Sequence, residues 1–298
     1  MKNNVSDYFL INENRKYLDS YYSNGIPSDN ISKLRKSIRV LQTFGIAGVL
    51  KILKKGKSKN YISDTKEENC TEVKYKKRVA IYTAIIGGYD KLQEPKYVSP
   101  FCDYYVFTDG EVSNESIWKK KKMVLSEEFK ILGNYQKAKF LKVFPHILFP
   151  EYEYSIWLDG NIEIYGELIV FIDRMNNRFL AGFEHPSNDC IYDEAITIVS
   201  QGKAEGREVI RQIKGYKKQG FPEHYGLLEN SFIIRKHNDK TCVNLMELWW
   251  EQMKEYTWRD QLSLTYSMWK CGIKLEDVTI LGPCWRWNPR LRQYDHMR

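Results

Sequence analysis

Residues 78–90 read RVAIYTAIIGGYD, an almost unbroken apolar run that ends in two glycines, a tyrosine and an aspartate. A strand that is buried on both faces has such a run, because neither of its sides meets water. The paired glycines indicate a turn where the strand leaves the sheet. The run therefore predicts a central strand over residues 78–86 and a fold built around it.

Two later runs end on a carboxylate in the same way. YYVF at 104–107 is followed by Thr108-Asp109-Gly110, and YSIWL at 154–158 is followed by Asp159-Gly160-Asn161. Apolar spacing predicts further strands and helices. The strands are expected at 179–183 and 231–235, and the helices at 135–144, 205–216, 242–256 and 260–270. Alternation of this kind predicts an α/β fold with a mostly parallel central sheet flanked by helices.

In such a sheet, ligands bind outside the C-terminal ends of the strands. We therefore expect the turns after the first and third runs, together with Asp109, to line one crevice. Gly87 and Gly88 let the backbone approach a ligand, Tyr89 can stack on a base, and Asp90 can accept hydrogen bonds from a ribose. The same residues also fit an ordinary turn between a strand and a helix.

Asp159 is the sharpest candidate for chemistry. At the end of a buried strand, one carboxylate can hold Mg²⁺ or Mn²⁺ together with phosphate and water. A cation at this point neutralises a diphosphate leaving group while a glycosidic bond breaks. The alternative is a simple Asp-Gly turn.

Charge is unevenly distributed along the chain. Residues 1–78 contain 17 Lys and Arg against 8 Asp and Glu, whereas residues 79–298 contain 29 against 30. The larger part is not basic, so a nucleic acid partner is not expected. We divide the chain into a basic helical appendage at 1–55, a polar linker at 56–77 and the α/β domain at 78–298.

The appendage contains residues 38–53, IRVLQTFGIAGVLKIL, an apolar stretch with basic flanks. It is too short and too often interrupted by polar residues to span a bilayer, which needs about 20 apolar residues. A helix of this kind either lies on an anionic membrane surface, through residues 33–59, or packs on the main domain or on a second copy of the chain in a homodimer.

Cysteine usage and the N-terminus indicate the compartment. The six cysteines form no C-x-x-C pair, and residues 1–30 contain no apolar signal-peptide core. Reduced thiols in a cytoplasmic protein are the simplest expectation. Attachment through residues 33–59 places the protein at the inner face of the membrane.

Several motifs in consistent order resemble one known family. They are IYTAIIGGYDKLQEP (81–95), DYYVFTD (103–109), KFLKVFPHILFPEYEYSIWLDGNI (139–162), FEHPSNDCIYDEA (183–195), GLLENSFIIRKHND (226–239) and ELWWEQMKEYTWRDQLSLTY (247–266). Over roughly residues 78–272 the chain resembles the glycosyltransferase-like family of bacterial polysaccharide loci and plant mucilage and cell-wall proteins. The resemblance implies a GT-A-like fold, a nucleotide-diphosphate sugar donor, UDP-linked, and a polysaccharide or glycoconjugate acceptor, as in capsule biosynthesis.

The resemblance also implies roles for individual residues. Asp159-Gly160-Asn161 stands where related enzymes carry an Asp-x-Asp metal motif, so Asn161 replaces a carboxylate with an uncharged oxygen. Nucleotide or phosphate binding is expected from Thr83, Gly87, Gly88, Tyr89, Asp90, Asp109, Lys137, Lys139 and Asn161. Acceptor or sugar binding is expected from His185, Asp189, Glu194, Asn230, Arg259 and Gln261.

Two carboxylates are candidates for the catalytic base. If transfer inverts the anomeric centre, a carboxylate takes the acceptor proton, and Asp260 and Glu229 are both in matching motifs. On the helix before Asp159, Lys137 and Lys139 cannot share one face, so only one of them is expected to point at the site.

Two other classes of function stay open at this stage. A hydrolase could use the same acidic crevice, although no G-x-S-x-G or H-E-x-x-H motif supports it. A non-catalytic polysaccharide-assembly protein could keep the fold and the binding site without turnover.

Overall fold

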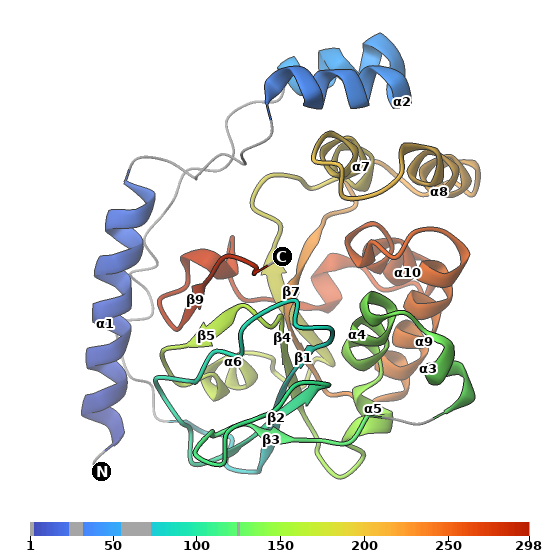
Figure 1. Cartoon of the computed structure of the whole chain (residues 1–298). Helices are drawn as coiled ribbons and strands as arrows, with labels where there is room; N and C mark the ends of the chain where they lie inside the picture. Colours follow the sequence, from blue (N-terminus) through green and yellow to red (C-terminus); the bar gives the residue numbers. More distant parts are fainter. Residues whose placement is uncertain (1–2, 24–31, 55–72, 124–125, 298) are drawn as a thin grey trace.

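The fold was analysed in a computed structural model, which describes residues 3–23, 32–54, 73–123 and 126–297. A seven-stranded sheet in the order β3-β2-β1-β4-β7-β6-β8 forms its centre (Figure 1). The strands of this sheet are β1 (Val79–Ile85), β2 (Cys102–Thr108), β3 (Lys119–Lys120), β4 (Ser155–Leu158), β6 (Leu180–Glu184), β7 (Leu228–Arg235) and β8 (Thr279–Ile280).

Strand directions make this sheet mostly parallel, as predicted. β1 runs parallel to β2 and β4, β2 parallel to β3, and β6 parallel to β8. The exception is β7, which lies antiparallel to both β4 and β6. β1 is buried along its whole length because both faces of the sheet are covered, and this is why its sequence is apolar throughout.

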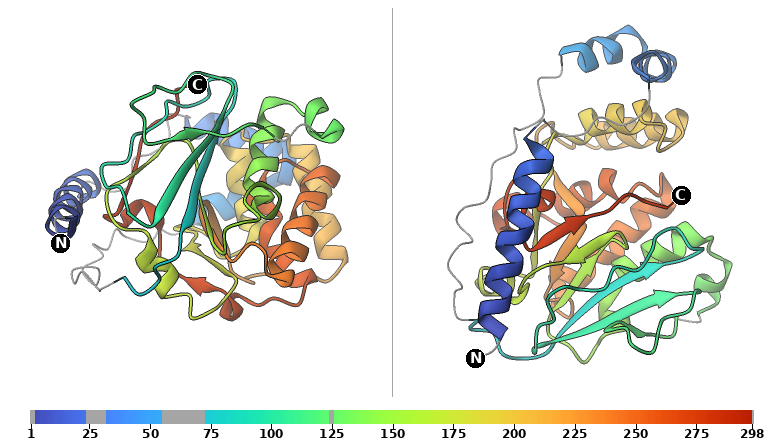
Figure 2. Two further views of the ribbon diagram at one scale, coloured as in Figure 1. Left: turned by 90° about the horizontal axis from the view of Figure 1, so that it is seen from below. Right: turned by 60° about the vertical axis from the view of Figure 1, so that its left-hand side comes forward.

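Helices cover the two faces of the sheet and one end of it (Figures 1 and 2). One face carries α4, α5, α9 and α10, and the other carries α6. The helices are α1 (Asn3–Tyr22), α2 (Lys33–Lys54), α3 (Glu127–Ile131), α4 (Asn134–Val143), α5 (Pro145–Leu148), α6 (Ile169–Asp173), α7 (Ile191–Ser200), α8 (Gly206–Lys218), α9 (Lys240–Glu255) and α10 (Leu264–Lys270).

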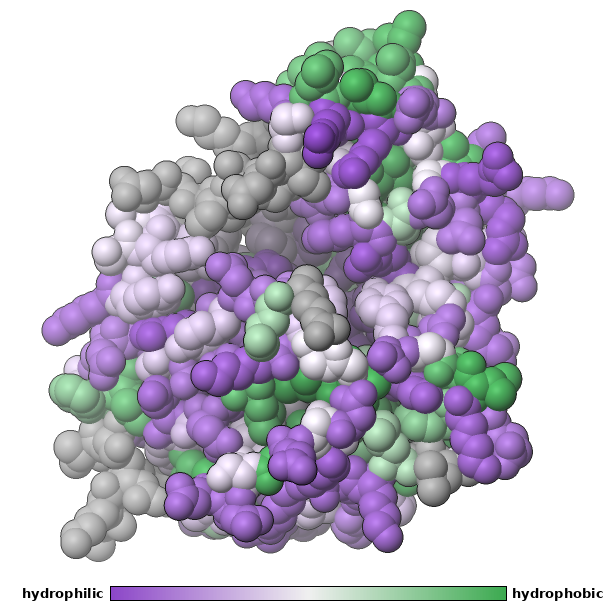
Figure 3. Space-filling view, in the orientation of Figure 1, coloured by the Kyte–Doolittle hydropathy of each residue, from purple (hydrophilic) through white to green (hydrophobic). Residues whose placement is uncertain are grey.

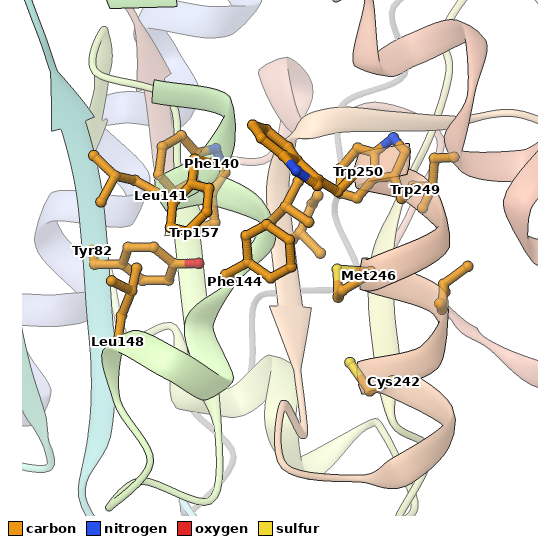
Figure 4. Packing of buried hydrophobic residues seen from close by; sticks show 14 of the residues in the cluster. Tyr82, Phe140, Leu141, Phe144, Leu148, Trp157, Cys242, Met246, Trp249 and Trp250 are labelled. Atoms are coloured by element: carbon orange, nitrogen blue, oxygen red, sulfur yellow. The ribbon is translucent and has the colours of Figure 1, made fainter. Parts of the chain in front are cut away.

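Aromatic packing joins the sheet to α4 and α9. Phe140 of α4 and Phe144, which directly follows that helix, contact the Trp250 ring of α9, with ring centroids 5.3 and 5.5 Å away (Figure 4). Tyr82 and Trp157, from β1 and β4, pack against each other beneath α4 with centroids 5.2 Å apart. This core fixes α4 against the ends of β1 and β4, so side chains on that helix hold defined positions.

A second, two-stranded sheet was not predicted. β5 (Ile162–Ile164) pairs antiparallel with β9 (Leu291–Gln293), which brings the C-terminal segment back beside the Asp159 turn. Tyr294 continues this pairing, because its N–H donates to the Asn161 carbonyl. Residues near the C-terminus therefore reach the same region as the strand ends.

The N-terminal helices pack against this body. In α1, the Asn14 Nδ2 donates to the carbonyls of Pro289 and Leu291, at 2.8 and 2.9 Å. Along α2, a kink occurs at Gly45, whose φ is +66°. The expected linker at 56–77 lies outside the described residues except for 73–77.

Three expectations about elements and thiols have a clear outcome. The helix expected over 260–270 is divided, because a 3₁₀ turn at Asp260–Leu262 precedes α10. Of the six cysteines, the five in the described residues are free thiols, and Cys70 lies outside them. Among the described residues, no helix combines the length and the apolar character that crossing a bilayer requires.

Candidate active site

A cleft of about 400 Å³ opens at the ends of β1 and β4, next to α4. Its size lies within the range of small-molecule sites. It brings together the glycine turn, the acidic turn and the α4 helix, which are far apart in the sequence. The lining residues are Ala84, Ile86, Gly87, Tyr89, Asp90, Asn134, Tyr135, Ala138, Lys139, Lys142, Trp157, Asp159, Gly160, Arg259 and His296.

The glycine turn is held by a carboxylate from the neighbouring strand. Gly87 N–H donates to both carboxylate oxygens of Asp109, at 3.0 and 2.9 Å. Gly87 and Gly88 have φ values of +70° and +62°, which glycine adopts without the steric cost that other residues meet. Asp109 thus holds the glycine turn through hydrogen bonds and is not among the residues that line the cleft, so the ligand contact expected of it stays a prediction.

Replacing Gly87 by alanine is expected to weaken both folding and ligand binding. A Cβ at this position would lie 2.5 Å from Asn134 Nδ2, so Asn134 must move, and the left-handed φ adds a cost of about 1–3 kcal/mol. Gly88→Ala is the matched control, because it meets the φ cost while no atom of the described part of the chain lies within 4 Å of the added Cβ. Thermal unfolding and nucleotide titration of both variants test this. Equal nucleotide affinity in the two variants would show that the Asn134 side of the cleft is not used.

Asp159 is held by two donors at the floor of the cleft. Its Oδ1 accepts a hydrogen bond from Trp157 Nε1 at 2.8 Å and lies 3.4 Å from Lys142 Nζ. Its backbone N–H donates to the Ser231 carbonyl of β7. The carboxylate is therefore preorganised, and one third of the side chain stays exposed to the cleft, which leaves Oδ2 as the oxygen available to a ligand.

Two lysines of α4 converge on Asp260. Lys142 Nζ and Lys139 Nζ lie 2.7 and 2.9 Å from the same oxygen, Asp260 Oδ2. All three side chains are nearly buried, so their charges are weakly screened. Burial alone would raise the pKa of Asp260, but the two ammonium groups hold that pKa well below its usual range. Burial lowers the pKa of Lys139, and the negative charge of Asp260 more than offsets this, so the net direction is upward.

A buried arginine fixes the backbone beneath these lysines. Arg235 Nη1 donates to the Lys142 carbonyl at 2.7 Å, and Arg235 Nη2 donates to the Tyr82 hydroxyl at 2.5 Å. The Tyr82 hydroxyl in turn donates to the Lys142 carbonyl. Burial raises the pKa of Tyr82 to about 12 although Arg235 opposes it, so the tyrosine is neutral. The end of α4 is thus anchored to β1 and β7, which keeps Lys142 in place.

The opposite wall of the cleft comes partly from the C-terminus. His296 Nδ1 lies 2.7 Å from Asp90 Oδ1, and the imidazole packs against the Tyr89 ring with centroids 4.9 Å apart. The hydrogen bond to Asp90 raises the pKa of His296. Sequence reasoning missed this residue, because only the pairing of β9 with β5 brings it to the site.

Tyr135 carries two cations on its ring at the mouth of the cleft. Lys139 Nζ lies 5.1 Å and the Arg259 guanidinium 5.6 Å from the ring centroid. Arg259 also donates from Nε to the Lys203 carbonyl at 2.6 Å. Of the two lysines that cannot share a helical face, Lys139 lines the cleft, whereas Lys137 Nζ lies over the Phe129 ring.

Asp159 is the candidate ligand for a divalent cation, and the other carboxylate that lines the cleft, Asp90, is paired with His296. Asn161, expected beside it, is 3% exposed, and its Nδ2 donates to the Tyr294 carbonyl at 2.7 Å. The described residues contain no cluster of three or more His, Cys, Asp or Glu side chains suited to a metal ion. One carboxylate completed by phosphate and water is a known arrangement for Mg²⁺, so Asp159 is the residue that would hold the ion.

Other candidates lie behind the cleft or away from it. Thr83 is buried within β1. Glu229 is buried against Arg286, with 2.5 Å between Oε1 and Nη2, and burial raises the pKa of Glu229 while Arg286 opposes this. Within the described part of the chain, neither of these residues lines the cleft, and Asp260 does not line it either. Asp260 contacts Lys139 and Lys142, which do line it.

Of the residues expected to bind the acceptor, one lines the cleft and the others do not. Arg259 lines the cleft, and Gln261 Nε2 donates to the Leu228 carbonyl. Asn230 is buried, and both polar atoms of its amide lack a hydrogen-bond partner among the described residues. The others gather before and within α7. There His185 Nε2 lies 3.5 Å from Glu194 Oε2, and Asp189 pairs with His224 at 2.9 Å.

Comparison with known proteins gives one family. The sequence profile of the family "TOD1/MUCI70, glycosyltransferase-like domain" matches residues 46–286. A relative in Arabidopsis thaliana, described as "Probable hexosyltransferase MUCI70", is 25% identical over an alignment 264 residues long, and the match covers 78% of this chain and 44% of the relative. The chain thus spans less than half the length of this relative.

A solved structure is similar to most of the chain. It is the apo structure of the bifunctional glycosyltransferase WbbM, with a TM-score of 0.44 and 12% sequence identity. The alignment covers 95% of this chain and 59% of that one.

Proposed function

The chain belongs to the TOD1/MUCI70 glycosyltransferase-like domain family, and on this premise we propose that it transfers a hexose from a nucleotide-diphosphate donor to a polysaccharide or glycoconjugate acceptor. The observation that carries this proposal is the convergence of the Gly87 turn, Lys139 and Asp159 on one cleft. A diphosphate needs cations and close backbone approach, and this cleft offers Lys139, Arg259 and the glycine turn.

The donor is proposed to lie across the cleft with its base near Tyr89. The half-exposed Tyr89 ring gives the base an aromatic surface, and Asp90 beside it accepts hydrogen bonds from the ribose. Lys139 and Arg259 are the cations for the phosphates. A UDP-linked donor is the form we propose, as the resemblance implies.

Asp159 is proposed as the protein ligand of a divalent cation. When bound, the cation would neutralise charge on the leaving diphosphate. The chain's own contribution is to orient Asp159 through Trp157 and to hold Lys142 nearby, so that the groups need no rearrangement during the reaction.

Asp260 is proposed as a positioning residue, although the sequence made it a candidate base. A carboxylate that serves as counter-ion to two ammonium groups is a weak proton acceptor, because protonating it leaves both charges unpaired. Glu229 is the other candidate base from the sequence; burial raises its pKa, but it is paired with Arg286 and lies outside the cleft lining, so its role stays a prediction.

Nucleotide titration and donor hydrolysis test the proposal. We expect UDP to bind, Mn²⁺ to increase its affinity, and one or more UDP-hexoses to be slowly hydrolysed. Gly88→Ala, which meets no neighbouring atom, should keep most of this binding and serves as a mild reference. Product formation from a glycan or ester substrate without nucleotide would favour the hydrolase instead. Donor binding with no transfer to any acceptor would favour a non-catalytic assembly protein, and no binding of any nucleotide would contradict the proposal.

The cellular location is proposed on the same premise. A cytoplasmic position gives the enzyme access to nucleotide sugars, and peripheral attachment at the inner face of the membrane places it near a growing glycan. The helix that would make this attachment is α2, which forms most of the 33–59 segment. The lysines of that segment beyond residue 54 lie outside the described residues.

A further inference from the structure

The helix α2 has one face bound to the body of the protein. Arg39 Nη1 donates to the Ser200 carbonyl at the end of α7, and Lys51 Nζ pairs with Asp193 at 2.9 Å. Val40 is fully buried, and Thr43 packs so closely on Gly206 that no Cβ fits there. These contacts with α7 and α8 fix which side of α2 points outward.

The outward side is a row of exposed aliphatic side chains. On each side of the Gly45 kink the row follows i, i+4, i+7 spacing, which places its members on one face of each half. Leu34, Ile46 and Leu53 have 70–72% of their surface exposed. The row consists of Leu34, Ile38, Leu41, Ile46, Leu50 and Leu53. Apolar side chains gather over α2 at the top of the molecule in Figure 3.

The charge on α2 is of one sign. Its sequence, KLRKSIRVLQTFGIAGVLKILK, contains six Lys and Arg residues and no acidic residue. Lys33 and Arg35 are exposed at its start, next to Leu34. An apolar row on a helix that carries positive charges and no acidic residue matches the boundary of an anionic membrane, where acyl chains and negative headgroups lie together. A second copy of the same helix would bring like charges together, which disfavours self-association through this face.

We propose that α2 docks the protein on an anionic membrane surface through this outward row. The row enters the headgroup and acyl boundary while the inner face stays bound to α7 and α8, so docking needs no unfolding. The helix would lie flat on the membrane, which agrees with its being too polar to span the bilayer.

Docking through α2 also orients the catalytic cleft, a consequence that rests on the proposed function. Arg39 of α2 lies against Gly202, and the next residue, Lys203, accepts a hydrogen bond from Arg259 at the cleft. The cleft is thus connected to the membrane-facing helix through a few residues of the α7–α8 connection. An acceptor held at the membrane, such as a lipid-linked glycan, would approach from this side.

Vesicle flotation of the full chain tests the docking proposal. We expect binding to vesicles that contain phosphatidylglycerol and much weaker binding to phosphatidylcholine vesicles. A triple variant replaces three exposed members of the row by glutamine, a good helix former, and should reduce binding by about tenfold or more. Its substitutions are Leu34→Gln, Ile46→Gln and Leu53→Gln. The control replaces exposed isoleucines elsewhere and should bind as the wild type does. Its substitutions are Ile117→Gln, Ile131→Gln and Ile147→Gln.

The possible outcomes separate the two proposals. Equal flotation of the wild type and the row variant would overturn the docking proposal. A second result would also overturn it: the wild type is a dimer in solution, does not bind vesicles, and becomes a monomer in the row variant. The row would then contact a second copy of the chain. Unchanged unfolding temperature and unchanged hydrolysis of soluble donor in the row variant would show that only docking was altered.

Discussion

Replacing Asp159 by asparagine is expected to lower the rate of donor hydrolysis about 100- to 1000-fold, the usual effect of removing one preorganised electrostatic group. Asparagine keeps the size of the side chain and can still accept the hydrogen bond from Trp157 Nε1. It loses the negative charge that Asp159 offers to a divalent cation, whereas Asp90, the other carboxylate that lines the cleft, is paired with His296. The increase in UDP affinity on adding Mn²⁺ should also disappear in this variant.

Asp109→Asn is the matched control for this experiment. Asp109 also follows a strand of the same sheet, but it supports the Gly87 N–H from behind the turn. A cation-dependent increase in UDP affinity should therefore persist in Asp109→Asn. If Asp159→Asn hydrolyses the donor at the wild-type rate, Asp159 has no catalytic role and the cation assignment fails with it.

Replacing Asp260 by asparagine is expected to lower the free energy of unfolding by about 3–5 kcal/mol, the typical cost of removing one partner of a buried ion pair. The variant leaves Lys139 and Lys142 close together without their shared counter-ion. Denaturant unfolding at neutral pH measures this. A mixed variant, Asp260→Asn with Lys139→Met, should recover part of the loss because one unpaired charge is removed.

The pH dependence of this effect has a definite sign. The folded pKa of Asp260 is lowered, so its contribution to stability is fully present above its unfolded pKa, about 3.9. That contribution is lost as pH falls from this value through the folded pKa. The stability difference between the wild type and Asp260→Asn should therefore be constant near neutral pH and shrink below about pH 4. A difference that grows on acidification would contradict the ion-pair account.

The central strands could be predicted because burial on both faces requires an unusual sequence. Residues 78–86 and 154–158 are apolar almost throughout, and β1 and β4 are found there. The rule that ligands bind at strand ends then placed Gly87, Asp90 and Asp159 in one crevice, and all three line the cleft. The spacing on α4 likewise indicated that Lys137 and Lys139 diverge.

Other elements could not be predicted, because their cause is not local. α7 was missed since Ile191 to Val199 is rich in β-branched residues, which suit strands as well as buried helices. The direction of β7 depends on how the chain returns to the sheet, and its own apolar pattern does not record this. Helical spacing at 260–270 did not reveal the break at Ser263, between the 3₁₀ turn that holds Asp260 beside two lysines and α10.

The site predicted from the sequence was incomplete because some of its contacts depend on residues far apart in the chain. His296 and Asp90 are separated by more than 200 residues and meet only because β9 pairs with β5. Asn161 appeared to be a ligand from its place two residues after Asp159, yet the same strand pairing directs its amide to Tyr294. Lys142 was one of three lysines on one helix, and only the buried Arg235 beneath it shows why this one is fixed.

A crystal structure of the chain with UDP and Mn²⁺ tests the central claim most directly, because it locates the nucleotide. The claim is that the cleft between the Gly87 turn, Lys139 and Asp159 binds a diphosphate. We predict electron density for UDP with its phosphates within hydrogen-bond reach of Lys139 and its uracil beside Tyr89. UDP bound in another pocket, with this cleft still empty at saturating nucleotide, would contradict the account.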